Sequence, residues 1–530
     1  MSRRLTLVSA VAVLLIAGLL PLAAILQESV TVDGMITLSV YRKLFAHPTN
    51  YLGSISHTLL LATLTAAIAL CLGVVFGLLF AKTDLPLRRT FALLLALPLF
   101  MPPYIVALSW TNVLGRDGVL SGVMHEPVVS TLHEALYGLP GCVFVMVCAL
   151  MPLMMILTMM ALSSINPRLE EAARLTADWP YTLRHITLPI AQPAIVFATL
   201  IIFLLTVGEV AVPMLLRYPV YPVQTLVQFA AFYDFGAAAA TAVPLLLLAT
   251  LLVALERRYF ADRASRLLAQ TPAKRQLVVP LRAWRLPAAL LVGLACVVLV
   301  LLPMGALLRT SLSPFGYAEA WHRTADSLMR TVAYAGVGAT LLTAVGFLCG
   351  YLIERRTLRW WRTVDGLTLL LFTVPGTVIG VGLIALWNHS VTGFIYASSA
   401  MIILAYLAQY TALTSRVSVA MLAIVPVSLE EAAQMSGAPW LARLVRIIIP
   451  AAAPGVITAW ILAFIFCLRD VGASMLVYPA GADPLPVRIF TLMANGSPSL
   501  ISAACVTLIA INLAMLSLLF ALLRTSRQRA

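Results

Sequence analysis

The chain has 530 residues, of which 62% are hydrophobic and 11% are charged, and its formal net charge at pH 7 is +14. Soluble globular domains contain about 25% charged residues, so this composition excludes a series of soluble domains. We therefore expect a polytopic membrane protein, in which the basic excess reflects either cytoplasmic loops or a nucleic-acid partner.

The apolar stretches are long enough to predict twelve membrane spans, because a helix needs about 20 residues to cross about 30 Å of hydrocarbon. In the first half the spans are expected at 5–26, 58–80, 91–113, 143–162, 195–216 and 237–255. In the second half they are expected at 286–308, 332–353, 367–387, 401–424, 454–471 and 500–523. The first resembles the core of a signal peptide, but it is longer than usual and no clear cleavage site follows, so we expect it to be retained.

The placement of lysine and arginine predicts the orientation of the spans. Most of the 35 basic residues fall in alternate loops, in a central linker at 257–285 and at the two termini. The positive-inside rule then predicts that both termini are cytoplasmic. The linker is expected to lie against anionic membrane lipid through Arg257, Arg258, Arg263, Arg266, Lys274 and Arg275. Because the charge follows the topology, we expect no nucleic-acid partner.

The two halves form a tandem repeat. Corresponding residues are Thr58 and Thr331, Pro102 and Pro375, Glu171 and Glu431, and Met214 and Met475. Six spans per half is an even number, so the copies share one orientation and are related by an axis along the membrane normal. We expect a first repeat at 1–256, the linker at 257–285 and a second repeat at 286–530.

Prolines and glycines cluster in the third and ninth spans. The residues are Pro98, Pro102 and Pro103 in one span, and Pro375, Gly376, Gly380 and Gly382 in the other. A break at membrane depth is tolerated where other helices or a cavity satisfy the freed backbone groups. Two interpretations stay open, a packing kink and a hinge that lines a transport path.

A polar stretch occurs once in each half, as LEEAARLTADWPYTLRHITLP at 169–189 and LEEAAQMSGAPWLARLVRIIIP at 429–450. Asn166 can cap the first helix ahead of Pro167, and Ser428 with Glu431 matches a capping box in the second. The helix dipole favours the negatively charged glutamates in the first turn. The small side chains of the paired alanines would let another protein approach the helix closely. Gly437 can end the second helix in a left-handed turn.

Both stretches resemble the EAA loop of ABC importer permeases, which reads Glu-Ala-Ala, three residues, Gly, and a hydrophobic run that closes in Leu-Pro. The loops are placed at 165–190 and 425–450. The second keeps the glycine at Gly437, whereas the first has Ala177 there and is one residue shorter before its proline. The resemblance implies an all-α type I ABC importer permease fold with two parallel six-helix repeats.

In that family the loop forms a coupling helix that sits in a cleft of a cytoplasmic ATPase. The resemblance therefore implies two copies of an ATP-binding subunit, a periplasmic or extracellular substrate-binding protein, and a bacterial inner membrane location. The implied coupling residues are Glu170, Glu171, Ala172, Ala173, Ala177, Glu430, Glu431, Ala432, Ala433 and Gly437.

The chain itself is not expected to be an enzyme. A P-loop reads GxxxxGK[ST], and here Lys43, Lys82 and Lys274 follow Arg42, Ala81 and Ala273 rather than glycine. We therefore expect ATP to be used by the partner subunits, with no cofactor bound by this chain.

Two acidic residues fall at membrane depth, Glu209 in the fifth span and Asp470 at the corresponding point of the eleventh. A charge there is costly and usually faces a cavity or a partner, so we expect a pair of carboxylates beside the substrate path. The alternative is a structural role, such as Asp470 paired with a basic group on another helix. Arg469 would point about 100° away on a continuous helix.

The substrate is predicted by resemblance and by ligand chemistry. Carboxylates suit a hard cation such as ferric iron. The fused architecture resembles permeases for ferric iron, thiamine and 2-aminoethylphosphonate, and segments 223–240 and 476–497 look most like the ferric iron branch. We expect ferric iron first and thiamine or an aminophosphonate next. A secondary transporter, which needs no ATPase, is the alternative from another class.

Overall fold

The computed structural model describes residues 3–32, 35–46, 48–115, 118–122, 126–230, 232, 234–259, 277–313 and 315–529. These residues are almost all helical, apart from an antiparallel pair of two-residue strands, β1 (Thr31–Val32) and β2 (Met35–Ile36). The predicted all-α class is confirmed. Arg263, Arg266, Lys274 and Arg275 of the central linker lie outside the described residues, so its contact with lipid stays a prediction.

The elements run in the following order, with η marking short 3-10 or π-helical segments. The first described region begins with α1 (Arg3–Leu14), η1 (Leu15–Leu19), α2 (Leu20–Glu28), α3 (Ser39–Ala46), α4 (Pro48–Lys82), α5 (Arg88–Ala96), η2 (Leu97–Phe100), α6 (Pro103–Leu114), η3 (Val119–Gly122), α7 (Glu126–Leu136) and α8 (Leu139–Ser164). It continues with α9 (Pro167–Arg174), α10 (Trp179–Thr182), η4 (Leu183–Thr187), α11 (Leu188–Val207), α12 (Ala211–Leu215), α13 (Tyr221–Ala230) and α14 (Phe235–Tyr259).

The chain after the linker has a similar order of elements. It begins with η5 (Arg282–Trp284), α16 (Arg285–Cys296), η6 (Val297–Leu301), α17 (Leu302–Ser311), α18 (Gly316–Glu354), α19 (Trp361–Thr373), α20 (Gly376–Trp387), α21 (Gly393–Tyr396) and α22 (Ala400–Leu422). It ends with α23 (Val427–Met435), α24 (Trp440–Arg443), η7 (Leu444–Ile448), α25 (Ile449–Ala451), α26 (Ala453–Leu468), α27 (Ser474–Val477), α28 (Leu485–Asn495) and α29 (Pro498–Arg529).

Long apolar helices account for the predicted spans. Among the described residues, 8 helices are long and apolar enough to cross a membrane. Another 4 helix pairs, each bent by more than 40°, raise the number to 12 if each pair is one span. Two of these pairs coincide with the proline-rich third and ninth spans, where the bends are 106° and 107°. The predicted breaks are confirmed, because Pro102 and Pro375 stand in extended backbone at the starts of α6 and α20.

The helices form two compact units that cut across the two halves of the sequence. Unit 1 contains Met1–Tyr51, Gln224–Val253 and Tyr317–Ala530, and unit 2 contains Leu52–Val223 and Ala254–Gly316. In unit 1, α2 packs along α20, and the backbone of Gly382 lies close to Pro21. In unit 2, α16 packs on α5 and α17 on α6. Each unit thus contains the first span of the other sequence half, and the repeat boundaries at 256 and 286 stay a prediction.

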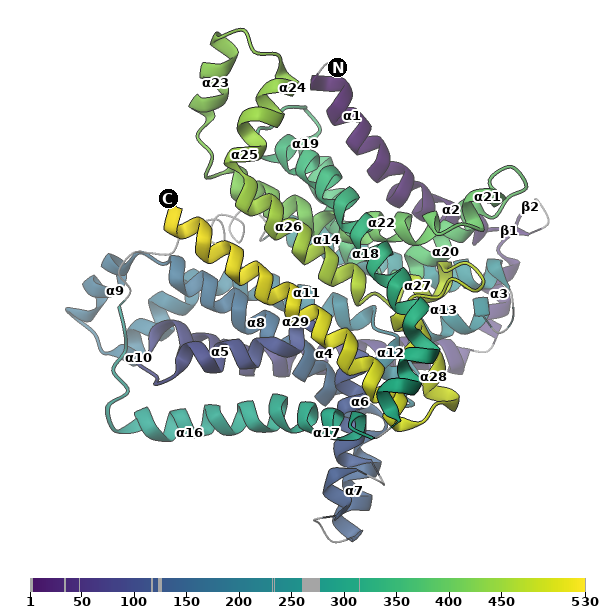
Figure 1. Cartoon of the computed structure of the whole chain (residues 1–530), viewed down its shortest axis with the longest axis horizontal. Coiled ribbons are helices and arrows are strands. Elements are labelled where there is room, and N and C mark those ends of the chain that lie inside the picture. Colours follow the sequence, from purple (N-terminus) through teal and green to yellow (C-terminus); the bar gives the residue numbers. More distant parts are fainter. Residues whose placement is uncertain are drawn as a thin grey trace. The chain divides into compact units, whose positions relative to one another are not determined.

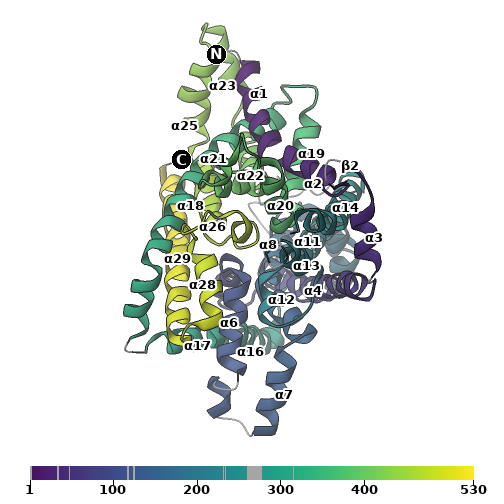
Figure 2. The ribbon, with the colours of Figure 1, turned by 90° about the vertical axis from the view of Figure 1, so that its right-hand side faces the viewer.

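Each unit has its polar loop at one end. In unit 1, α23 and α24 lie near the N-terminus, and α28 lies at the far end of the same bundle (Figures 1 and 2). In unit 2, α9 and α10 lie at one end, whereas α12 and α17 lie at the other (Figure 1). The longest helix of each unit, α4 or α18, begins well before its predicted span. The helices contain the predicted spans 58–80 and 332–353, and polar residues continue each helix beyond the apolar segment.

Glycines bring the long helices close to their neighbours. A Cβ on Gly73 or Gly77 of α4 would lie within 3 Å of side-chain atoms of Met154 or Thr158 of α8. The second half repeats this contact between α18 and α22, where Gly346 and Gly350 face Thr414 and Ser418. The contact recurs at corresponding positions, as the predicted repeat requires. It packs each long helix against the span that leads into the polar loop.

We predict that Gly350→Ala destabilises the protein. The new Cβ would lie 2.8 Å from the backbone oxygen of Ser415, which cannot rotate away. Overpacking of this kind costs about 1–3 kcal/mol. Gly336→Ala on the same helix is the matched control, because nothing lies within 4 Å of its added Cβ. Thermal unfolding in detergent should show a lower midpoint for Gly350→Ala alone, and equal midpoints would contradict the packing.

Candidate coupling helices and membrane-depth carboxylates

The first polar loop begins as a capped helix. Asn166 is extended, and its side chain accepts a hydrogen bond from the backbone N–H of Arg168, 3.1 Å away. Pro167 follows in the first turn, where its missing N–H costs nothing. The predicted start of α9 is confirmed.

The two glutamates of the first loop point in opposite directions. Glu170 is 1% exposed and accepts hydrogen bonds from Lys82 Nζ at 2.7 Å and Thr187 Oγ1 at 2.9 Å. Lys82, the last residue of α4, is itself buried. Glu171 is exposed, because successive residues of a helix are about 100° apart. One glutamate is therefore hydrogen-bonded inside the fold, and the other faces solvent.

The second loop repeats this division. Glu430 is buried, accepts a hydrogen bond from the Tyr351 hydroxyl at 2.5 Å, and lies 3.9 Å from Arg355 Nε. Tyr351 also accepts a hydrogen bond from Trp440 Nε1 of α24 at 3.3 Å. Glu431 is exposed. The buried glutamate again contacts the C-terminal end of the long helix. Here the contacts are a neutral hydroxyl and a more distant guanidinium.

The predicted capping box of the second loop is wrong. Pro426, in extended backbone, occupies the N-cap position and α23 begins at Val427, so Ser428 already lies inside the helix. A proline preorganises the backbone for a helix start, which explains why the helix begins earlier than the capping pattern indicates.

The two loops end differently. Gly437 has a φ of 76°, and the N–H of Ala438 donates to the oxygen of Ala433, as predicted for a left-handed helix end. In the first loop the Ala177 N–H donates to Ala173, and its carbonyl accepts from Arg174 Nη1 at 2.5 Å. An arginine therefore holds the end of the first helix, and no residue with positive φ is needed at Ala177.

Apolar side chains extend the exposed face of both helices. Ala172 and Ala432 are exposed, whereas Ala173 and Ala433 are partly buried. Leu175 and Met435, at corresponding positions, are 86% and 89% exposed. These residues, like Lys82, Tyr351 and Arg355, are not among the predicted coupling residues. The recurrence of a basic residue after each long span, 273 residues apart, was a signal that could have found Lys82 and Arg355.

The membrane-depth carboxylates stand beyond helix ends. α11 ends at Val207, well before the predicted span end at 216, and α26 ends at Leu468, close to the predicted end at 471. Each carboxylate instead lies at the turn into a short helix, α12 or α27. Arg469 is consequently not on a continuous helix, and its guanidinium lies 5.1 Å from the ring centre of Phe466.

Both carboxylates accept backbone hydrogen bonds at the start of the following short helix. Glu209 Oε1 is 3.0 Å from Ala211 N and 3.3 Å from Val212 N. Asp470 is 5% exposed, and its oxygens accept from the Tyr410 hydroxyl at 2.8 Å and from Ser474 N and Oγ at 2.9 and 2.6 Å. A neutral hydroxyl, rather than the basic group considered above, joins Asp470 to another helix.

A buried threonine near the other end of each long helix holds the next element. Thr58 Oγ1 accepts the N–H of Tyr221, the first residue of α13, at 2.8 Å. Thr331 Oγ1 accepts the N–H of Leu485, the first residue of α28, at 2.6 Å. These threonines are 3% and 1% exposed. The same contact therefore joins α4 to α13 and α18 to α28.

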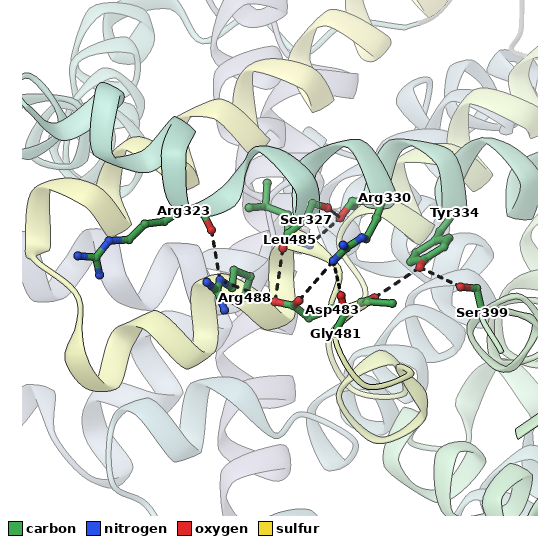
Figure 3. A network of polar contacts seen from close by, with 11 residues as sticks. Arg323, Ser327, Arg330, Tyr334, Ser399, Gly481, Asp483, Leu485 and Arg488 are labelled. Carbon is green, nitrogen blue, oxygen red and sulfur yellow. Dashed lines mark hydrogen bonds and ion pairs between the residues drawn. The ribbon is translucent and has the colours of Figure 1, made fainter. Parts of the chain in front are cut away.

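Arginines surround the second of these contacts (Figure 3). Arg330 Nη1 donates to the Gly481 oxygen at 2.6 Å and lies 3.8 Å from Asp483 Oδ1. Arg488 of α28 lies 3.8 Å from the other oxygen of Asp483. The turn before α28 is thereby fixed to α18 by side chains as well as by backbone contacts.

Comparison with known proteins identifies the family. Residues 343–528 match the family model described as binding-protein-dependent transport system inner membrane component. A spermidine/putrescine transport system permease protein of Haemophilus influenzae is 30% identical over 219 residues, which cover 40% of this chain and 83% of that protein. The chain belongs to this family of transport permeases.

Over longer alignments this permease is similar to two proteins named for ferric transport. A ferric transport system permease protein of Actinobacillus pleuropneumoniae is 25% identical over 448 residues, covering 80% of this chain and 64% of that protein. A provisionally named one of Haemophilus influenzae is 25% identical over 443 residues, covering 78% of this chain and 69% of that protein. The permease thus spans about two thirds of the length of these relatives.

Family membership and the apolar helices make this permease a multi-pass inner membrane protein. Within the described part of the chain, no group of three or more His, Cys, Asp or Glu side chains is placed to hold a metal ion.

We predict that Asp470→Ala destabilises the permease more than Tyr410→Phe. The alanine leaves the buried Tyr410 hydroxyl without its acceptor, which costs about 1–3 kcal/mol. Tyr410→Phe leaves Asp470 with both Ser474 donors, so its cost should stay near about 1 kcal/mol. Thermal unfolding midpoints in detergent measure the difference, and an unchanged midpoint for Asp470→Ala would contradict a structural role for this carboxylate.

Proposed function

We propose that this chain is the transmembrane permease of an ATP-driven importer that receives its substrate from a binding protein. The observation that carries the proposal is the pair of exposed helices, α9 and α23, each held by a buried glutamate and each presenting a second, exposed glutamate. Large exposed apolar side chains on a soluble face are typical of a surface that a partner covers. Two copies of a cytoplasmic ATPase would therefore dock there, one on each helix.

The orientation follows from this assignment. With α9 and α23 in the cytoplasm, both termini are cytoplasmic, which agrees with the distribution of lysine and arginine. The opposite face would receive the substrate-binding protein from the periplasm or the exterior. ATP binding by the partners would draw the docking helices together and convert the halves from an inward-facing to an outward-facing packing.

Ferric iron is the substrate that we propose. Two relatives that align with most of this chain are named for ferric transport. Hard cations favour oxygen ligands, and Glu209 and Asp470 supply carboxylates beside the proposed path. Glu209 is the stronger candidate for substrate contact because it is only partly buried, whereas Asp470 would shape the path by holding Tyr410.

Two other substrates and one other mechanism remain as competitors. Relatives of Salmonella typhimurium named for 2-aminoethylphosphonate transport are 24% and 25% identical, and thiamine is the third candidate by resemblance. A secondary transporter would move its substrate without an ATPase.

Uptake into proteoliposomes tests the proposal. The permease is reconstituted with its ATPase, and radioactive ferric iron is added on the loaded binding protein. We predict uptake that requires ATP and that unlabelled thiamine or 2-aminoethylphosphonate does not reduce. Competition by either compound would reassign the substrate, and uptake without the ATPase would establish a secondary transporter.

The same assay tests the docking helices. Glu171→Arg or Glu431→Arg should reduce ATP-dependent uptake at least about tenfold, because reversing a charge within a docking surface disturbs its electrostatic match with the partner. Both glutamates are exposed, so the fold should be unchanged. Asp326→Arg is the control, since this exposed residue of α18 is remote in sequence from both loops. Normal uptake in both glutamate variants would refute docking at α9 and α23.

A further inference from the structure

The buried glutamate of each loop sits at the meeting point of three elements. Glu170 of α9 bonds to Lys82 at the end of α4 and to Thr187 at the end of η4. Glu430 of α23 bonds to Tyr351 of α18, and Tyr351 in turn accepts from Trp440 of α24. In both halves one carboxylate therefore joins the docking helix to the long helix and to the return segment of the loop.

The contact in unit 2 is closed off from water. The side chains of Lys82 and Glu170 are 2% and 1% exposed. Beside them lies a hydrophobic cluster made of Ala81, Ala161, Leu162, Ile165, Ala191 and Ala194. A buried charge without its partner is strongly unfavourable, so each member of the pair restricts where the other can lie.

The two halves make this contact with different groups. Lys82 and Arg355 correspond at a spacing of 273 residues, and Glu170 and Glu430 correspond at 260. In the first half the ammonium bonds directly to the carboxylate, whereas in the second Arg355 Nη2 donates to Val425 at 3.0 Å and the hydroxyl of Tyr351 bonds to the glutamate. The carboxylate thus keeps its position in both halves although its hydrogen-bond donor differs. This favours a role in positioning the docking helix over a role that needs one particular charge.

We propose that Glu170 and Glu430 are positioning residues that lock the docking helices to α4 and α18, so that a displacement of the docked subunit moves the membrane helices. This inference rests on the proposed function. The exposed glutamate beside each of them meets the partner, while the buried one transmits the movement. The competing explanation is that these glutamates only stabilise the fold. A variant in which both members of the ion pair are replaced by uncharged side chains distinguishes the two explanations.

The decisive variant is Lys82→Met with Glu170→Gln. Removing both charges avoids the cost of leaving one member of a buried ion pair unpaired, and glutamine keeps an oxygen for the Thr187 hydroxyl, so the double variant should still fold. The lock, however, is weakened. A spin label at Leu175, which is 86% exposed, then reports the mobility of α9 in a background with Cys71→Ser.

We expect a more mobile label at Leu175 in the double variant, measured on the permease alone. With the ATPase and binding protein present, uptake per ATP should fall about tenfold, within the range known for residues that modulate coupling. ATPase binding should change less, because Glu171 is intact. Glu319→Gln, which removes a partly exposed carboxylate of α18 that pairs with Arg323 on the same helix, is the control and should leave the spectrum and the uptake unchanged.

The outcomes separate this inference from the proposed function. A wild-type label spectrum together with wild-type uptake per ATP in the double variant would overturn the positioning role. Loss of the folded state in the double variant, with Lys82→Arg still functional, would assign the pair to stability and also overturn it. Failure of the wild-type protein to show ATP-dependent uptake would refute the proposed function instead, whereas the label still tests whether Glu170 holds α9.

Discussion

The structure depends on a buried carboxylate at the first glutamate of each duplicated loop. It adds a direct side-chain contact with the long helix to the contacts that α9 and α23 make with the return segments of their own loops. With it, α9 and α23 are held sideways against α4 and α18. Because successive helical residues point about 100° apart, the same pair of glutamates can hold the helix and still present an acidic side chain to a partner.

The long helices extend this constraint through the membrane. α4 contacts the loop at Lys82, packs closely on α8 through Gly73 and Gly77, and holds α13 through Thr58. The second half repeats all three contacts along α18. Interfaces of this kind change between discrete packings rather than deform continuously, so a helix held at three points moves its attached elements together. α13 and α28 each come one short helix after the turns that carry Glu209 and Asp470, and in our proposal they relate the docking end to the substrate path.

Local sequence patterns predicted the elements, but contacts across the fold decided their details. The twelve apolar stretches, the proline breaks at Pro102 and Pro375, and the left-handed Gly437 are local, and the structure agrees with them. Which of two adjacent glutamates is buried depends on Lys82, which lies 88 residues away from Glu170. The packing of the first span in unit 1 depends on α20, and the helix ends before Glu209 and Asp470 depend on hydrogen bonds made by those carboxylates. Hydropathy carries no signal for such contacts.

Distances between spin labels decide whether each docking helix moves together with its long helix. Labels at Met329 and Met435, both exposed, report whether α18 and α23 move as one body in the complete transporter. We expect their distance to stay within about 2 Å between the nucleotide-free and ATP-trapped states, while the distance between Leu175 and Met435 changes by more. A change between Met329 and Met435 as large as that between the two loops would contradict this expectation.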